Sequence, residues 1–227
     1  MPGAYDWERF EADDPSQRLR LVASVFRGDP FDRDYLRRFA GYMARPTQWP
    51  PPLPAAYCGV RVDIFEADQL IAKISRPIGE STGNWRIRAE DGGATIDLTF
   101  RPRWSHPPHQ RTLLAGEGNH QWIIDAPLCD VAGEVRLNGK NRAFSGLGFH
   151  DRILGRRPIA LSLEKWMWGR ILSPDRAVLF HQLWPTKWAR QIHVVEADGA
   201  GIRQAAASEI SIEPPAVCQT VFPARLG

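Results

Sequence analysis

Short runs of alternating apolar and polar residues, separated by turn signals, constrain this chain more than any other feature. Alternation with a period of two is typical of β-strands that bury one face. Asn138-Gly139 between two such runs predicts a tight hairpin. The sequence therefore predicts an all-β fold, a sandwich or a barrel. The runs cover residues 18–26, 56–65, 70–74, 85–89, 94–100, 122–124, 133–137, 142–147, 163–172, 177–183 and 191–196.

One segment has helical spacing instead. Aromatic and apolar residues recur at helical intervals over residues 32–43, which predicts one short helix near the N-terminus. The proline-rich stretch 46–54 then predicts a stiff connector, and 102–109 a long surface loop. Near residues 127–131 we expect the chain to pass from one β unit to another. We therefore predict two β domains, residues 1–130 and 131–227.

Composition narrows the class of protein. A chain of 227 residues with 43% hydrophobic and 24% charged residues is typical of a folded soluble protein. Cys58, Cys129 and Cys218 are odd in number and widely spaced, which predicts reduced thiols in a cytoplasmic protein. Neither a signal peptide nor a membrane span is indicated. The net charge of +3 lies in scattered short pairs, so nucleic-acid binding is not expected, whereas weak peripheral contact with anionic lipid stays open.

Candidate chemistry lies in residues 146–155, Gly-Leu-Gly-Phe-His-Asp-Arg-Ile-Leu-Gly. Asp151 follows His150 within otherwise apolar sequence. Apolar neighbours disfavour the charged form of a carboxyl group, and a neighbouring imidazole can exchange its proton near neutral pH. This pair predicts a general acid, provided that a substrate needs a proton. The alternative is an aspartate that accepts backbone hydrogen bonds in a turn.

Four segments, taken in order, carry a family resemblance: Tyr-Asp-Trp-Glu-Arg-Phe at 5–10, His-Gln-Trp to Asp-Ala-Pro at 120–127, the glycine-rich hairpin at 133–155, and Trp-Met-Trp-Gly-Arg at 166–170. Together they resemble the carotenoid 1,2-hydratase (hydroxyneurosporene synthase) family. That family is part of a lipocalin-like group with the AttH-type proteins and the fungal decalin-forming Diels–Alderases. The resemblance implies two lipocalin-like β units with a pocket between them.

Three residues depart from the family pattern. Phe149, Arg152 and Leu154 stand where the family commonly has Tyr, His and Trp. These departures leave the substrate and the reaction open.

The family reaction adds water to an isolated carbon–carbon double bond of a polyisoprenoid. It needs a protonated acid, π-faces near the developing cation and a positioned water. By resemblance Asp151 is the proton donor, His150 holds or replenishes the proton, and His120 orients the water or takes up its released proton. The resemblance thus implies a cofactor-independent hydro-lyase acting on an apolar, isoprenoid- or carotenoid-like substrate. The residues assigned to the wall and border of the pocket are Trp7, Trp122, Phe149, Trp166, Trp168 and Arg170.

Each assignment has a structural alternative. His120 follows a glycine-rich turn and could be a surface histidine. Trp166 and Trp168 share one strand face by alternation and could be plain core. Trp7 could anchor the N-terminus, and Arg170 could pair with a carboxylate for structural reasons.

Other kinds of site have little support in the sequence. His106 and His109 are closely spaced, but they have no acidic or cysteine partner nearby, so no metal site is expected. Nucleophile elbows, phosphate loops and dinucleotide fingerprints are not found, so we expect no cofactor. Two further functions stay open: a terpenoid or polyene cyclase (Diels–Alderase-like) using the same pocket, and a non-catalytic carrier of an apolar ligand. The oligomeric state is left open.

Overall fold

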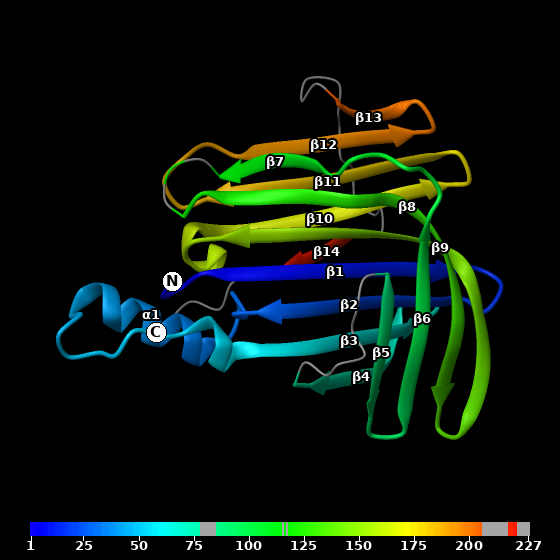
Figure 1. Cartoon of the computed structure of the whole chain (residues 1–227), viewed down its shortest axis with the longest axis horizontal. Coiled ribbons are helices and arrows are strands. Elements are labelled where there is room, and N and C mark those ends of the chain that lie inside the picture. The colour runs from blue at the N-terminus through cyan, green and yellow to red at the C-terminus, as the bar shows by residue number, and fades with distance from the viewer. Residues whose placement is uncertain (78–84, 115, 117, 206–217, 222–227) are drawn as a thin grey trace.

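Strands dominate the computed structural model, which describes residues 1–77, 85–114, 116, 118–205 and 218–221 (Figure 1). The predicted all-β class with one short helix is confirmed. In chain order the elements are β1 Tyr5–Asp14, β2 Leu19–Arg27, α1 Arg33–Ala44, the 3₁₀ helix η1 Pro54–Tyr57, β3 Cys58–Glu66, β4 Gln69–Arg76, β5 Arg86–Asp91, β6 Ala94–Pro102, β7 His109–Leu114, β8 His120–Leu137, β9 Lys140–Gly155, the 3₁₀ helix η2 Ile159–Ser162, β10 Leu163–Ser173, β11 Arg176–Pro185, β12 Gln191–Asp198, β13 Gly201–Gln204 and β14 Cys218–Val221.

Within the described residues, β1 to β9 form one nine-stranded sheet that curls into a nearly closed barrel. Its order is β4-β3-β2-β1-β9-β8-β6-β5, and β7 pairs with the free part of β8. The two edge strands of this sheet, β4 and β5, approach each other. The backbone N–H of Ser75 on β4 donates to the carboxylate of Asp91 on β5 at 3.5 Å. Figure 1 shows β5 and β6 crossing in front of β2 and β3.

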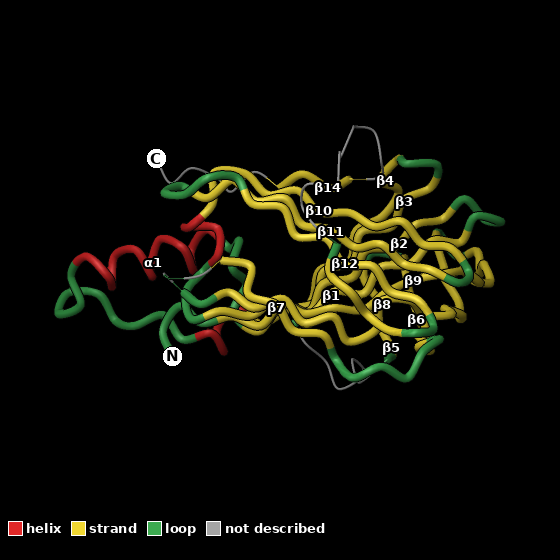
Figure 2. Tube along the Cα trace, turned by 90° about the horizontal axis from the view of Figure 1, so that it is seen from above, coloured by secondary structure: helices red, strands yellow, loops and turns green. Residues whose placement is uncertain are grey.

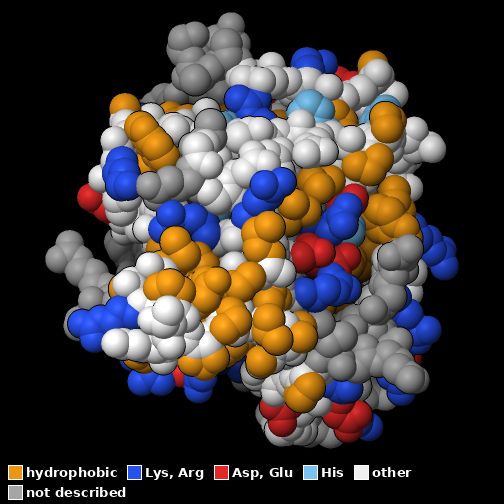
Figure 3. Space-filling model, turned by 60° about the vertical axis from the view of Figure 1, so that its left-hand side comes forward, with side chains coloured by type: hydrophobic (Ala, Val, Ile, Leu, Met, Phe, Trp, Pro, Cys, Tyr) orange, Lys and Arg blue, Asp and Glu red, His pale blue; other side chains and the backbone are white. Residues whose placement is uncertain are grey.

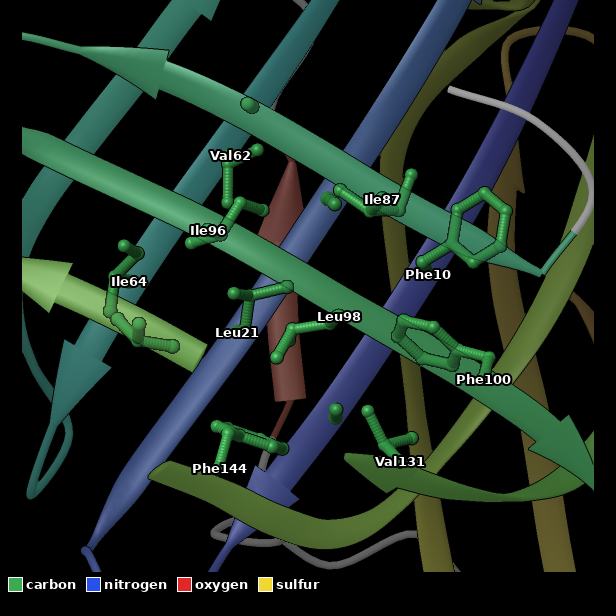
Figure 4. Close-up of a cluster of buried hydrophobic side chains, with 14 of the residues drawn as sticks. Phe10, Leu21, Val62, Ile64, Ile87, Ile96, Leu98, Phe100, Val131 and Phe144 are labelled. Atoms are coloured by element: carbon green, nitrogen blue, oxygen red, sulfur yellow. The ribbon is translucent and has the colours of Figure 1, made fainter. Parts of the chain in front are cut away.

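The barrel interior is filled by side chains from strands on opposite walls. Figure 4 shows Ile96 and Leu98 on β6 pointing toward Leu21 on β2, with Phe10 and Phe100 beside them. All of these side chains are buried. A packed apolar core of this kind stabilises the barrel.

The strand β8 changes its pairing partner halfway along. Residues 120–124 pair with β7 and residues 129–137 pair with β6, and register shifts occur on either side of Ala126. The predicted passage near 127–131 therefore coincides with a bulged bend in one strand. Because β8 and β9 continue through this bend, the chain leaves the first sheet only after Gly155. The domain division at residue 130 stays a prediction.

A five-stranded sheet, in the order β13-β12-β11-β10-β14, packs against the first sheet. Figure 2 shows it as a separate layer, with the barrel strands gathered at the right. A second apolar core fills the space between the two sheets. Its largest members are Tyr5, Trp7, Phe26, Trp122, Phe149, Trp166 and Trp168.

The local predictions can be compared with these elements. The helix is confirmed at Arg33–Ala44, and Asp32 caps it by accepting from the backbone N–H of Tyr35 at 2.8 Å. The Asn138-Gly139 hairpin is confirmed with φ of +50° and +77°, the backbone that a two-residue turn requires. The expected loop lies between β6 and β7. The strand β1 was missed, as its charged residues obscure the alternation.

Surface features bear on location and binding. Among the described residues, we find no helix with the length and apolar character needed to span a membrane. On the face in Figure 3, basic side chains are scattered among acidic and apolar ones. Cys58 and Cys129 are free thiols, whereas the side chain of Cys218 lies outside the described part of the chain.

Two glycines in the β8–β9 hairpin test the close packing of β1 on β9. A Cβ at Gly146 would collide with the backbone carbonyl of Asp13 on β1, whereas nothing lies within 4 Å of a Cβ at Gly139. We expect Gly146→Ala to lower the free energy of unfolding by about 3 kcal/mol through overpacking. Gly139→Ala should lower it by only about 1 kcal/mol, from its positive φ. Urea unfolding measures both, and equal losses would contradict this packing.

Candidate functional site

Both faces of β1 are buried, although the strand carries several charged residues. Trp7 belongs to the core between the sheets, whereas Phe10 belongs to the barrel core. Alternation therefore directs Arg9 and Glu11 toward the second sheet, where they are 1% and 3% exposed. Buried charges are costly unless they are paired and hydrogen-bonded. The partners of these two residues define the candidate site.

Arg9 is paired with Asp151, its direct neighbour across β1 and β9. Its Nε donates to Oδ1 of Asp151 at 2.8 Å, and its Nη2 donates to Oδ2. The indole Nε1 of Trp122 donates to the same Oδ2 at 2.7 Å. Both carboxyl oxygens thus accept N–H groups, an arrangement that suits an ionised carboxylate.

The surroundings of Asp151 differ from the sequence prediction. Its side chain is fully buried, as expected of a residue in an apolar segment. The expectation of purely apolar neighbours is wrong, because the guanidinium of Arg9 lies against the carboxyl group. Burial lowers the pKa of Arg9, but the charges of Asp151 and Glu11 outweigh it and hold that pKa above its usual value. Arg9 is therefore a permanent cation beside the candidate acid.

His181 on β11 completes the cluster from the second sheet. Its Nδ1 lies 2.8 Å from the indole Nε1 of Trp166, and its Nε2 lies 3.2 Å from Nη2 of Arg9. Both neighbours are N–H donors. A neutral imidazole accepts a hydrogen bond at one nitrogen only, whereas a protonated imidazole accepts none and would point an N–H at each neighbour. Burial, and then the charge of Arg9, lower the pKa of His181 well below its usual value. His181 is therefore neutral.

A second set of charges continues along the same face. Arg170 on β10 donates through Nη1 to Glu11 and through Nη2 to Asp13 at 2.6 Å, and Trp168 donates to Glu11 at 3.2 Å. Phe149 lies between the two arginines, with its ring centre 5.8 Å from Cζ of Arg9 and 5.5 Å from Cζ of Arg170. We call this set the intersheet cluster: Arg9, Glu11, Trp122, Phe149, Asp151, Trp166, Trp168, Arg170 and His181.

Aromatic rings enclose the cationic centre of this cluster. Cζ of Arg9 lies 5.2 Å from the ring centres of Trp7 and Trp168, within the range of cation–π attraction. Trp7 meets Trp166 and Trp168 edge-on, with ring centres 5.4 and 5.7 Å apart. The layer between the sheets therefore already stabilises one positive charge with π-faces.

Three buried N–H donors in and beside the cluster have no hydrogen-bond partner within the described part of the chain. They are Nη1 of Arg9, Nε1 of Trp7 and Nε of Arg170. Buried donors are almost always satisfied by protein or by ordered water. These three N–H groups are therefore candidate donors to a water or to a ligand oxygen.

The structure brings most of the predicted site residues together. Asp151 and the predicted wall and border residues all lie between the two sheets: Trp7, Trp122, Phe149, Trp166, Trp168 and Arg170. Their catalytic and binding roles stay predictions.

The two predicted histidines lie elsewhere. His150 is on the opposite face of β9 from Asp151, where its ring stacks on Phe10 at 4.1 Å and its Nε2 lies 3.2 Å from Glu8. His120 is buried at the end of β8, with Nδ1 3.0 Å from the hydroxyl of Tyr5. Within the described part of the chain, His150 makes no hydrogen bond to Asp151.

Sequence reasoning missed Arg9, Glu11 and His181. Alternation from Trp7 would have placed Arg9 and Glu11 on the tryptophan-bearing face. No local signal indicates that His181 meets Arg9, because β1 and β11 belong to different sheets. Among the described residues, no three His, Cys, Asp or Glu side chains gather as metal ligands.

Comparison with known proteins gives a family likeness. The family model of the carotenoid hydratase CrtC matches residues 105–217. A curated relative, hydroxyneurosporene dehydrogenase from Chlorobaculum tepidum, is 26% identical over 209 residues, which cover 76% of this chain and 54% of that protein. The chain thus spans about half the length of the curated relative that it matches. The resemblance to the carotenoid hydratases is confirmed, and the chain is CrtC-like.

Solved structures share the fold. An AttH protein from Nitrosomonas europaea superimposes with a TM-score of 0.58 at 15% identity, over 92% of this chain and 70% of that one. CghA bound to Sch210972 gives 0.58 at 12% identity, over 88% and 59%. Kievitone hydratase from Nectria haematococca gives 0.51 at 10% identity, over 89% and 64%. The predicted lipocalin-like fold is confirmed.

The Arg9–Asp151 pair generates a stability prediction. Arg9→Met leaves a buried carboxylate without its counter-ion, and we expect the free energy of unfolding to fall by about 3–5 kcal/mol. Adding Asp151→Leu removes that charge as well, so the double variant should be more stable than Arg9→Met alone. Urea unfolding of the two variants tests the pair, and a double variant less stable than the single one would contradict it.

The buried histidines generate a pH prediction. Burial lowers the pKa of His193 to about 4, where Arg111 donates to its Nδ1 at 2.8 Å. An unfolded histidine has a pKa of about 6.5. Between these values the unfolded chain binds a proton that the folded chain does not, so stability is lost as pH falls from about 6.5 to about 4.

His181 adds to the same loss, because its pKa is lowered too. Each histidine should contribute a slope of about 1.4 kcal/mol per pH unit. Unfolding between pH 7 and pH 5 should show this fall, and His193→Asn should flatten it by about one proton. An unchanged slope in that variant would argue against a neutral buried His193.

Proposed function

We propose that this CrtC-like chain adds water to an isolated carbon–carbon double bond of an apolar, isoprenoid- or carotenoid-like molecule, at the intersheet cluster. One observation carries the proposal: Asp151 is fully buried on the same face as a set of tryptophan rings. A carboxylic acid can protonate an alkene only where water does not compete for the proton. Aromatic faces stabilise the cation that results.

The proposed reaction conserves protons. The O–H of a protonated Asp151 gives its proton to one alkene carbon, and the more substituted carbon becomes a tertiary cation. The oxygen of a water molecule forms a bond to that cation. The extra proton of the bound water returns to the Asp151 carboxylate, which leaves a tertiary alcohol and the original acid.

Arg9 and Trp122 have a defined part in this step. Both donate to the carboxylate that forms when Asp151 loses its proton. Their hydrogen bonds stabilise that carboxylate, which favours transfer of the proton to a poorly basic alkene. The proposed step requires Asp151 to carry its proton when the alkene is bound.

The nucleophilic water has candidate ligands in the same layer. Nη1 of Arg9 and Nε1 of Trp7 are buried donors without a partner among the described residues. A water that accepts from one of them keeps its second lone pair available for the cation. We leave His150 and His120 out of this proton path, because they face away from Asp151 or lie at the end of the layer.

A second candidate function is non-catalytic binding of an apolar ligand. It is favoured by the complete pairing of Asp151, whose two oxygens accept three N–H groups as in a structural ion pair.

The curated relative is named a dehydrogenase. Hydration adds the mass of one water and dehydrogenation removes two hydrogens, so the product mass separates them. Cyclisation would leave the mass unchanged. Cellular location and membrane contact stay predictions, and the oligomeric state stays open.

Incubation with acyclic carotenoids and shorter terpenes in heavy-oxygen water tests the proposal. The wild-type protein should yield an alcohol with the heavy label, and Asp151→Asn should abolish it. Asp97→Asn is the matched control, because Asp97 also accepts two donors from an arginine, Arg86, at 2.7 Å each, but on the outer surface. That variant should keep full activity.

Trp122→Phe keeps an aromatic ring and removes one donor to Asp151. We expect roughly a tenfold slower reaction, since one hydrogen bond to a charged group is worth about 1.5 kcal/mol. An Asp151→Asn protein that is folded, as judged by its circular dichroism, and fully active would exclude Asp151 as the acid. Ligand binding without any product would support the carrier.

A further inference from the structure

A separate cavity opens at one end of the intersheet cluster. Its volume is about 190 Å³, and it is lined by Asp13, Pro15, Gly146, Leu147, Arg170 and Leu172. Pro15 is exposed, and Leu147 and Leu172 are half-buried, so solvent reaches the cavity. Most of its lining is apolar.

Arg170 is one of the residues that line this cavity. Its side chain is only 5% exposed, and both of its terminal nitrogens are bonded to carboxylates on β1. Its Nε is buried and has no partner in the described part of the chain. An oxygen atom in the cavity would satisfy this donor. An anionic group is disfavoured, since Glu11 and Asp13 already surround the guanidinium.

The cavity lies on the same strand face as Asp151. Leu147, Phe149 and Asp151 alternate along β9, opposite Asp13, Glu11 and Arg9 on β1. Four residues of a strand span about 13 Å. Phe149 occupies the step between, with Arg170 on one side of it and Arg9 on the other. A molecule that reached from the cavity to Asp151 would be long and narrow and would displace the Phe149 ring.

We propose that this cavity is a subsite for the oxygen-bearing end of a linear apolar ligand, with the neutral oxygen accepting from Nε of Arg170. The ligand class is an isoprenoid with a hydroxyl or carbonyl group at one end. Its assignment as a substrate rests on the proposed function, since the double bond would then lie near Asp151. The subsite itself is a binding property.

Two probes of equal length test the subsite: farnesol, which carries a terminal hydroxyl, and β-farnesene, the corresponding hydrocarbon. Quenching of tryptophan fluorescence gives both dissociation constants. The wild-type protein should bind farnesol about tenfold more tightly, the effect of one hydrogen bond from a charged donor. Arg170→Met should bind the two probes equally.

A second pair of variants keeps Arg170 intact. Leu172→Phe narrows the cavity and should weaken the binding of farnesol at least tenfold. Ile171→Phe is its control, because Ile171 is the next residue on β10 and is 61% exposed. It should bind as the wild type does. Equal affinity of the wild type for both probes would overturn the subsite. So would an affinity of Leu172→Phe for farnesol that equals that of the wild type.

These results are separable from those on the proposed function. Arg170-dependent binding of farnesol without hydration of any alkene would retain the subsite and remove the hydratase. Hydration of an alkene by a protein that binds farnesol and β-farnesene equally would retain the hydratase and remove the subsite.

Discussion

The buried pair of Arg9 and Asp151 is the interaction on which the rest of the structure depends. It joins β1 to β9 on the face where the barrel meets the second sheet. A guanidinium and a carboxylate in such a place require full hydrogen bonding, which Trp122 and His181 help to provide from β8 and β11. The aromatic rings that surround the pair exclude water. The two sheets are thereby held together around a polar centre.

The same pair gives the centre its chemical character. Arg9 and Trp122 donate to Asp151 and so stabilise the carboxylate that remains after it gives up a proton. Tryptophan faces favour a second, transient positive charge in the same layer. Within the described part of the chain, one N–H group of Arg9 and one of Trp7 lack a partner and are candidate donors to a water. These features fit hydration of an alkene in a CrtC-like protein better than chemistry at the packed barrel interior.

Much of the fold was accessible from sequence, because turns and alternation are local. The helix after Asp32 and the hairpin at Asn138-Gly139 depend on capping and backbone φ, which neighbouring residues determine. The site was only half accessible. Strand alternation alone separates His150 from Asp151, so their adjacency in sequence was misleading. The pairing of Arg9 with Asp151 and the approach of His181 depend on tertiary packing, which no local pattern records.

The protonation state of Asp151 is the most direct test of the account. Infrared difference spectra of wild type against Asp151→Asn, with isotope-labelled aspartate, report whether this carboxyl is ionised. The account predicts a carboxylate band in the resting protein and a protonated carbonyl band when a saturating apolar ligand is bound. A carboxylate that persists unchanged while labelled alcohol accumulates would contradict it.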